Sequence, residues 1–377
     1  MRFRVERDVL AEVVAWAART LPSRPPVPVL AGVLVEAGEG SLTLSSFDYE
    51  VSARCTAEAV VEQQGSVLVS GRLLAEIARS LPARPVTVTT AEGGHKVEVT
   101  CGSARFTLPT LPVEEYPALP DLPAAAGQVD RAAFAAAVEQ VALAAGRDDT
   151  LPVLTGVRIE LSGETMTLAA TDRYRLAVRE LAWRPDNPSV EAVALVPART
   201  LRDAAKAFTH GDAVTVALAT GAIGEGLMGF EGAGRRTTTR LLDGEFPKYR
   251  SLLPTETAAT AQVSTAELME AVQRVALVAE RNTPVRLSFS PGQLVLDAGT
   301  GDEAQASEEL EATLDGEPIT IAFNPAFLLD GLRAIDAPTA HIAFVSPTKP
   351  AVLSGAGGDA PAAVGYRYLL MPVRLAG

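Results

Sequence analysis

Two kinds of hydrophobic spacing alternate along the chain. Stretches such as SLTLSSFDYEVSA (41–53) and TMTLAATDRYRLAV (165–178) place apolar residues at every second position, which is typical of half-buried antiparallel strands. Other stretches repeat their apolar residues with helical spacing and predict two helices in each third of the chain. These helices are expected within residues 7–21, 67–81, 130–146, 194–208, 264–280 and 320–335. Asp130 and Ser264 stand where N-caps belong, and Glu267 has capping-box spacing from Ser264.

An internal repeat organises these elements. Residues 27–54 and 151–179 align with an offset of 124, so that Pro28 matches Pro152 and Asp48 matches Asp172. A weaker third copy covers residues 283–307. Each copy has a helical segment ahead of it and a strand followed by a helix behind it, so the repeat unit is a whole domain. We therefore predict three tandem similar α+β domains, each with two helices packed on antiparallel sheets, at residues 1–120, 121–254 and 255–377.

Composition excludes several function classes. The 377 residues are 47% hydrophobic and 21% charged, as in a soluble globular protein. Two cysteines and three histidines without ligand-like spacing favour neither a disulfide framework nor a metal site. Neither a GxxxxGK[ST] motif nor a GxGxxG motif after a strand occurs. The N-terminus lacks a signal-like apolar region, and no stretch approaches the roughly 18 uncharged apolar residues of a membrane span, so a cytoplasmic protein is expected.

The charge of the chain first argues against nucleic acid as a partner. The formal net charge is -13, whereas phosphate binding normally leaves a basic footprint. The excess is uneven, with -3 in residues 1–120, -2 in residues 121–254 and -8 in residues 255–377. The charge therefore argues against a protein that grips DNA tightly, but it is compatible with one that holds DNA by topology.

Three collinear phrases carry a family resemblance. ATDRYRLAV (170–178), DGEFPKYRSLLP (243–254) and LLMPVRL (369–375), set within the threefold repeat, resemble the bacterial DNA polymerase III beta subunit, the replicative sliding clamp. The resemblance implies a head-to-tail homodimeric ring in which strands form the outer wall and helices line a hole around double-stranded DNA. It implies a processivity factor of DNA replication without catalysis, cofactor or membrane contact, associated with the nucleoid during replication. The expected partners, bound through short peptide motifs, are the polymerase III alpha subunit, the clamp loader, other polymerases and repair proteins.

The resemblance also implies a peptide-binding pocket made of leucine, proline, methionine and arginine side chains. Many members of the family have Gly-His where this chain has Arg173-Tyr174, so we expect a different pocket shape and ligand preference. The chain also continues past Leu375 with Ala376 and Gly377. The pocket residues carried over position by position are Leu154, Thr171, Arg173, Tyr174, Arg175, Leu176, Pro247, Ser251, Leu252, Asn324, Phe327, Pro350, Met371, Pro372, Val373, Arg374 and Leu375.

Basic residues on helices predict the surface that faces DNA. Arg199, Arg202 and Lys206 are spaced i, i+3, i+7 and share one helix face. Leu201, Ala205 and Phe208 lie elsewhere on that helix and suit the core. The first domain repeats the pattern with Arg72 and Arg79. The resemblance adds two loop arginines, Arg24 and Arg147, although Asp148 and Asp149 follow the second. The matching helix of the third domain keeps Arg333 alone.

An edge strand predicts the dimer seam. RFTLPTLP (105–112) resembles the edge strand of the family's first domain, with Phe106 and Leu108 as apolar anchors beside Arg105. Leu277 and Val278 of the third domain are expected opposite, with Glu303, Glu308 and Glu309 facing Arg105. An unpaired apolar edge would promote aggregation unless a partner covered it.

Two alternatives to an ordinary sliding clamp are kept. One is a clamp paralogue with an altered pocket, such as a copy that tolerates a peptide antibiotic. The other is a carboxylate-based hydrolase, because Asp48 and Asp172 each follow a strand. These aspartates belong to different repeats, however, and aspartate readily bonds to its own backbone in turns, so we interpret both as turn residues.

Overall fold

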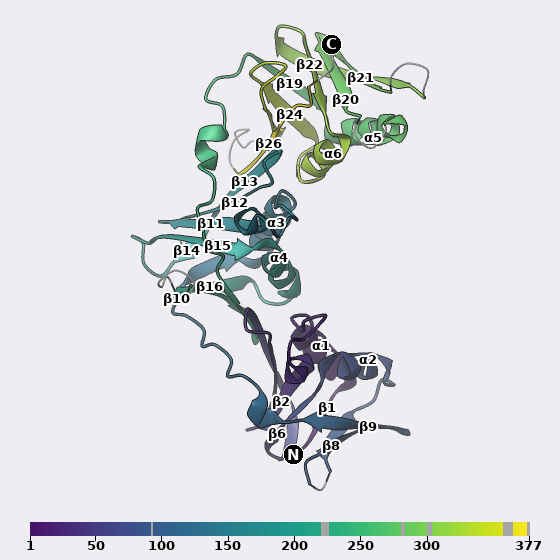
Figure 1. Ribbon diagram of the computed structural model, residues 1–377, viewed down its shortest axis with the longest axis vertical. Coiled ribbons are helices and arrows are strands. Elements are labelled where there is room, and N and C mark those ends of the chain that lie inside the picture. The colour runs from purple at the N-terminus through teal and green to yellow at the C-terminus, as the bar shows by residue number, and fades with distance from the viewer. Residues whose placement is uncertain (92, 220–225, 280–282, 300–303, 357–364, 375–377) are drawn as a thin grey trace. The chain divides into compact units, whose positions relative to one another are not determined.

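The computed structural model describes residues 1–377 except 92, 220–225, 280–282, 300–303, 357–364 and 375–377. The chain divides into two compact units, each made of residues that contact mainly one another. Figure 1 shows the course of the chain from the N-terminus to the C-terminus, coloured by residue number. Unit 1 consists of residues 1–132, 184–188 and 203–241, and unit 2 of residues 133–183, 189–202 and 242–377. The middle repeat contributes to both units, so the predicted domain bounds stay predictions.

The described residues contain two α-helices for each predicted domain, which confirms that part of the sequence interpretation. Ser264 caps the fifth helix by accepting a hydrogen bond from the Glu267 amide, and Asn324 caps the sixth by accepting from the amides of Ala326 and Phe327. None of the helices in the described part of the chain is both long and apolar enough to span a membrane. The α-helices are α1 (Arg7–Ala18), α2 (Gly71–Ser80), α3 (Arg131–Ala142), α4 (Ala198–Ala207), α5 (Thr265–Val275) and α6 (Pro325–Arg333).

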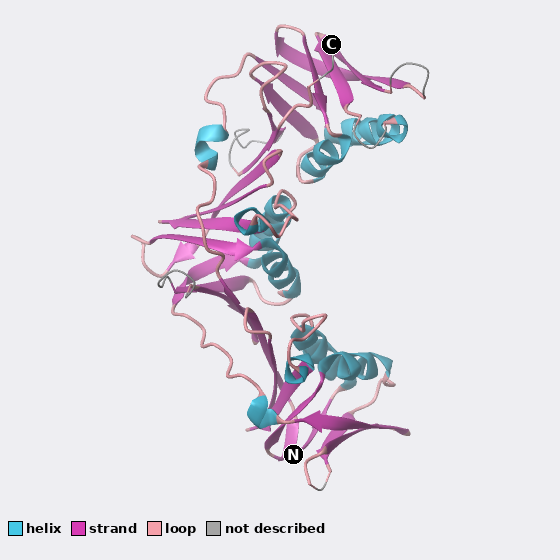
Figure 2. Ribbon diagram, viewed as in Figure 1, coloured by secondary structure: helices cyan, strands magenta, loops and turns pink. Residues whose placement is uncertain are grey.

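A single antiparallel sheet runs through unit 1. It joins the two repeats that contribute to this unit, because β4 of the first pairs with β18 of the second. Helices α1 and α2 lie against each other and cover strands β2, β3, β4 and β6 (Figure 2). In spatial order the strands are β14 (Arg184–Pro185), β10 (Ala125–Asp130), β16 (Ala213–Ala219), β17 (Leu227–Gly232), β18 (Arg235–Arg240), β4 (Val51–Glu58), β3 (Ser41–Phe47), β2 (Gly32–Gly38), β6 (Gly65–Ser70), β9 (Ala104–Leu111), β8 (Lys96–Cys101), β7 (Val86–Thr90), β1 (Arg2–Val5) and β5 (Val60–Gln63).

Unit 2 is built on a second antiparallel sheet. Here β13 of the second repeat pairs with β26 of the third, as β4 pairs with β18 in unit 1. Helix α5 packs on β19, β21 and β22, and α6 contacts α5 and β26. In spatial order the strands are β15 (Glu191–Pro197), β11 (Gly156–Ser162), β12 (Thr165–Thr171), β13 (Arg175–Ala182), β26 (Tyr366–Leu370), β25 (Ala351–Ala356), β24 (Thr339–Phe344), β19 (Ala259–Ser264), β22 (Ala306–Gly316), β21 (Gly292–Ala298), β20 (Val285–Ser290) and β23 (Ile319–Phe323).

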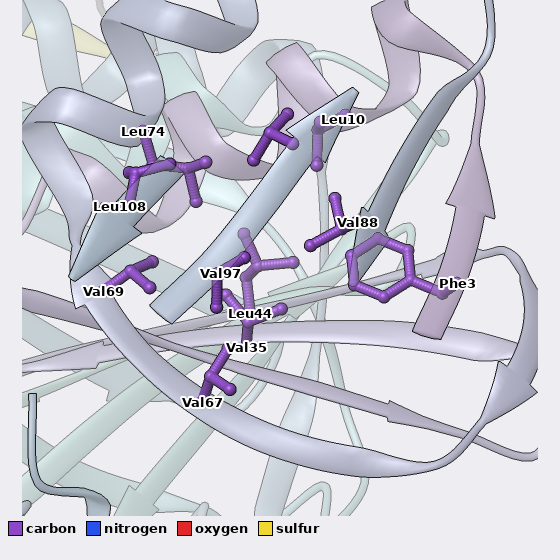
Figure 3. Close-up of a pocket in the computed structure, with 11 residues that line it drawn as sticks. Phe3, Leu10, Val35, Leu44, Val67, Val69, Leu74, Val88, Val97 and Leu108 are labelled. Atoms are coloured by element: carbon purple, nitrogen blue, oxygen red, sulfur yellow. The ribbon is translucent and has the colours of Figure 1, made fainter. Parts of the chain in front are cut away.

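The core of the first repeat shows why the alternating pattern folds this way. Inward-facing positions of β2, β3, β6 and β8 meet leucines of the two helices around a small apolar cavity of about 20 Å³ (Figure 3). Leu10 and Leu74 close it from the helix side, and Leu108 points into it from β9. Its lining side chains are all apolar, so their burial from water is the main force holding this layer together.

The repeated aspartates form the same turn in both units. Asp48 accepts hydrogen bonds from the amides of Glu50 and Val51, at 3.0 and 2.7 Å. Asp172 accepts from the amides of Tyr174 and Arg175, at 3.0 and 3.1 Å. These contacts confirm the turn role predicted for the aspartates and leave no carboxylate pair for hydrolysis at these positions, since the two turns belong to different repeats.

Candidate functional site

The predicted pocket residues belong to unit 2, where Leu154 lies in the short 3-10 helix at Pro152–Thr155, Pro350 lies just before β25, and the others come from four segments. These are the turn between β12 and β13, the linker around the short 3-10 helix η4 (Tyr249–Leu252), the start of α6, and the chain after β26. The pairing of β13 with β26 sets Arg175 opposite Leu370, and the Met371 amide then donates to the Tyr174 carbonyl at 2.9 Å. One strand pair therefore brings the turn and the C-terminal segment together.

Large apolar side chains stay exposed at this junction and on the linker. Tyr174 is 56% exposed, Leu252 50% and Met371 40%. The Tyr174 ring stacks on Phe327, with centroids 6.2 Å apart and planes 26° apart. Exposed apolar side chains that converge on one place commonly mark a binding surface.

Arg173 occupies an unusual backbone conformation beside these rings. Its φ is 80°, a left-handed value that side chains with a Cβ rarely adopt. The Thr171 hydroxyl accepts from the Arg173 amide at 3.2 Å and donates to the Arg175 carbonyl at 2.6 Å. The turn holds the strained residue in place and presents the Arg173 side chain to solvent.

Arg175 lies beneath the surface in a network of acids and rings. Its guanidinium bonds to Asp172 at 2.9 Å and to Asp330 at 2.6 Å, and its Cζ lies 4.4 Å from the Phe327 ring centroid. Burial lowers the pKa of Arg175, but Tyr368, Asp330 and Asp172 outweigh that effect and raise it above its ordinary value. Arg175 is 5% exposed, so it positions Phe327 from below and does not offer its charge to a ligand.

Two further predicted pocket residues are also buried. Leu176 is 1% exposed and belongs to a core cluster with Leu369, Phe246 and Tyr249, and Thr171 is 5% exposed. These side chains support the site from below, and their contact with a ligand stays a prediction. The physical reason is the alternation of β13, which sends Leu176 into the cluster that anchors the linker.

Residues outside the predicted set hold the site together. Asp330 and Tyr368 complete the Arg175 network, and the Tyr368 hydroxyl donates to the Phe327 carbonyl at 2.8 Å. Glu160 holds the linker by accepting from Arg158 at 2.6 Å, Tyr249 at 3.0 Å and Arg250 at 2.5 Å. Burial raises the pKa of Glu160, but these three donors outweigh it and lower the pKa below the ordinary value. No short motif signals Asp330 and Tyr368, because they lie 155 and 193 positions from Arg175 in the sequence.

The remaining predicted pocket residues differ in how far their side chains are exposed. Pro247 and Ser251 are exposed on the linker, and the Asn324 side chain is engaged in capping α6. The Val373 amide donates to the Ala322 carbonyl at 2.8 Å, which ties the C-terminal segment to β23. Leu154, Pro350, Pro372 and Val373 are half-buried and Arg374 is exposed, while Leu375 lies outside the described residues.

The basic helix positions of the first two repeats are exposed or half-buried, and their contact with DNA stays a prediction. Leu201, Ala205 and Phe208 of the second are buried, whereas Arg199 and Lys206 are exposed and Arg202 is half-buried. Arg72 and Arg79 are exposed on α2, where they bond to the carbonyls of Pro22 at 3.0 Å and Ala75 at 3.2 Å. The loop residues Arg24 and Arg147 are exposed as well.

Two arginines on helices of the third repeat, Arg274 and Arg333, are paired with acids of their own unit. Arg274 bonds to Glu308 at 2.6 Å and to Glu270 at 3.4 Å. Arg333 lies 3.8 Å from Asp330. The charge of these residues is thus partly neutralised, in keeping with the more acidic composition of the third repeat.

Two of the strands with an unpaired edge in the described part of the chain are β9 and β22, and β14, β5, β15 and β23 are the outermost strands of the two sheets. Residues 104–109 of β9 pair only with β8, and residues 306–312 of β22 pair only with β21. Arg105 is exposed and Phe106 half-buried on the first edge, and Glu309 and Glu311 are exposed on the second.

The predicted seam needs one correction. Leu108 is 1% exposed and fills the core of unit 1, because the alternation of β9 turns it inward, so it cannot serve as an interface anchor. Leu277 is 83% exposed and Val278 half-buried, whereas Glu303 lies outside the described residues. Glu308, expected opposite Arg105, pairs instead with Arg274 of its own chain.

Family models of the DNA polymerase III beta subunit match the chain in three consecutive parts. The N-terminal domain matches residues 1–120, the central domain residues 128–248 and the C-terminal domain residues 250–374. A "Beta sliding clamp" of Streptomyces coelicolor is 65% identical over 378 residues, covering 100% of both chains. A "Beta sliding clamp homolog GriR" of Streptomyces muensis is 50% identical and covers 99% of both.

A solved structure of a sliding clamp has the same fold as this chain. The sliding clamp of Pseudomonas aeruginosa, described as DNA polymerase III subunit beta and bound to griselimycin, superimposes with a TM-score of 0.89 at 27% identity over 100% of both chains. The repeat, the two antiparallel sheets and the three family matches therefore agree: the chain belongs to the bacterial DNA polymerase III beta subunits, the beta sliding clamps, with three clamp domains in tandem.

Proposed function

We propose that two copies of this clamp close head to tail around duplex DNA and act as a non-catalytic processivity factor in the bacterial cytoplasm. The observation that carries the proposal is the pair of unpaired edges, at residues 104–109 and 306–312. One edge presents Arg105 and the other presents Glu309 and Glu311, so the edges are complementary in charge as well as in hydrogen bonding. Because the two edges belong to different domains, the contact is heterologous and closes into a ring only for a suitable rotation.

The exposed apolar side chains of unit 2 support a further proposal, that the clamp binds short peptides of its partners. Tyr174, Leu252 and Met371 would receive the apolar side chains of a short peptide from the polymerase alpha subunit, the clamp loader or a repair protein. Arg173 and Arg374, exposed beside them, would meet acidic groups of the peptide. An extended segment of a partner would thus be tethered without any chemistry.

The arginines of α2 and α4 support non-specific contact with DNA. Arg72, Arg79 and Arg199 are exposed on helices whose opposite faces are buried. A small number of such contacts, on a chain with a net charge of -13, would leave the DNA free to slide.

Retention on circular DNA tests the ring. After loading with the clamp loader, the protein should stay on nicked circular DNA and leave the same DNA once it is linearised, because only topology holds it. Equal retention on both forms would contradict encirclement. Light scattering should give the mass of a dimer, and a strictly monomeric protein would contradict the ring.

A truncation tests the peptide site separately. Removal of residues 371–377 should abolish binding of polymerase-derived peptides in fluorescence anisotropy while the dimer persists, because neither unpaired edge is touched. Unchanged affinity would show that the pocket lies elsewhere.

The alternative of an altered paralogue is the weaker candidate. Identity is 65% to the clamp from Streptomyces coelicolor and 50% to the homolog GriR, over nearly the same length. Binding of griselimycin itself separates the two, since an antibiotic-tolerant copy would bind it more weakly than an ordinary clamp.

A further inference from the structure

Unit 1 contains a hollow of about 170 Å³ that the family function does not use. It is comparable to engineered cavities of about 150 Å³ that accept a benzene ring. The walls are formed by the Asp48 turn, the linker after the first domain, and the paired ends of β17 and β18. The lining residues are Phe47, Tyr49, Glu50, Pro120, Leu227 and Arg240.

The internal repeat places this hollow in the position that the predicted peptide pocket has in unit 2. Val51 pairs with Thr239 as Arg175 pairs with Leu370. The Arg240 amide then donates to the Glu50 carbonyl at 2.9 Å, the same bond that joins Met371 to Tyr174. Strand β17 flanks β18 as β25 flanks β26, with Leu227 facing Arg240. The equivalent pairs are Tyr49 and Arg173, Glu50 and Tyr174, Leu227 and Pro350, and Arg240 and Met371.

The backbone of the two sites agrees, whereas their side-chain chemistry differs. Phe47 and Tyr49 meet edge to face at 5.7 Å, so aromatic walls are present. Arg240 is already engaged, since its Nε donates to the Tyr49 carbonyl at 3.0 Å. Glu50 is exposed and has no ion pair in the described part of the chain. The equivalent position in unit 2 is the uncharged Tyr174.

We propose that the hollow is a second peptide-docking site, which takes an extended segment of a partner protein with one apolar anchor followed by a lysine or arginine. The anchor enters between Phe47, Tyr49 and Leu227, and the cation faces the Glu50 carboxylate. We place the cation at Glu50, because this carboxylate is exposed on the lining without an ion pair in the described part of the chain, whereas the lining arginine, Arg240, is held by the Tyr49 carbonyl. The proposal rests on the repeat equivalence with the pocket proposed in unit 2, but the hollow itself contains no residue of that pocket.

Two labelled peptides test the site on the full chain. Both carry the same Leu-Phe anchor, and lysines flank it in one and glutamates in the other. Fluorescence anisotropy should show tighter binding of the lysine peptide. Glu50→Lys, an exposed change compatible with folding, should weaken that peptide about tenfold and favour the glutamate peptide. Met371→Glu alters the other proposed pocket, in unit 2, and the binding of the lysine peptide at the hollow should persist in this variant.

A matched pair of glycine variants separates binding from folding. Tyr49→Gly and Arg173→Gly remove a side chain from the same left-handed turn position in the two repeats, with φ of 77° and 80°. Only Tyr49→Gly should weaken the lysine peptide. The proposal is overturned if the peptide is lost with Met371→Glu instead, if a lysine peptide with serines in place of the anchor binds equally well, if neither peptide binds, or if Glu50→Lys dissociates the dimer.

Discussion

At the scale of single residues, Arg173 keeps a backbone that glycine would adopt without strain. Its φ of 80° costs roughly 1 kcal/mol for a residue with a Cβ. We expect Arg173→Gly to raise the free energy of unfolding by up to about 1 kcal/mol in urea titrations. Gly292→Ala is the opposite control, because Gly292 has φ of 83° and open space around its would-be Cβ, and it should cost about 1 kcal/mol. A loss of stability in Arg173→Gly would contradict the strain.

Glu160 makes the linker sensitive to acid. Its folded pKa lies below the unfolded value of 4.5, because Arg158, Arg250 and Tyr249 all donate to its carboxylate. The stabilisation from ionised Glu160 is therefore fully present above pH 4.5 and is lost as the pH falls through the folded pKa. We expect the melting temperature of the wild type to exceed that of Glu160→Gln at neutral pH and to approach it in acid. A difference that grows on acidification would refute this role.

At the scale of elements, helix α6 presents Phe327 while Asp330, one turn further on, steadies it through Arg175. Asp330→Asn should cost about 1.5–3 kcal/mol, because a bond of 2.6 Å to a buried guanidinium is weakened. Peptide affinity at unit 2 should fall with it, since Arg175 no longer holds the ring. Arg333→Gln removes only the 3.8 Å surface contact of the same aspartate and should change stability by less than about 0.5 kcal/mol. Equal effects of the two variants would rule out the buried network.

The elements also show what sequence could and could not predict. Alternation and helical spacing fixed the type of each element, because burial of one face is a local property of the pattern. The turns at Asp48 and Asp172 were predictable for another local reason, since aspartate bonds readily to its own backbone and the two residues occupy the same place in different repeats. The burial of Leu108 was missed, since a strand pattern does not say which face meets the core. Asp330 was missed because its partner, Arg175, is 155 positions away in the chain.

At the scale of the whole molecule, two leucines separate folding from assembly. Leu108→Ala should cost about 2–5 kcal/mol in unit 1, because it enlarges an apolar cavity, and should leave the dimer intact. Leu277→Asp should do the reverse, since Leu277 is 83% exposed and contributes little to folding of the single chain. Urea unfolding and light scattering measure the two effects. If Leu108→Ala abolished the dimer in protein that is still folded, Leu108 would be shown to contribute to the dimer interface.

The pairing of β4 with β18 and of β13 with β26 determines which fragments of the chain can fold alone. Each pair uses strands from two different repeats, so a fragment that ends at a repeat boundary exposes the full hydrogen-bonding edge of an interior strand. A gene fragment encoding one clamp domain should therefore yield insoluble protein, although each repeat has the size of an ordinary domain. Repeats whose strands pair with those of the next repeat cannot be exchanged as modules. After gene duplication in such a chain, selection must act jointly on the two strands of every such pair.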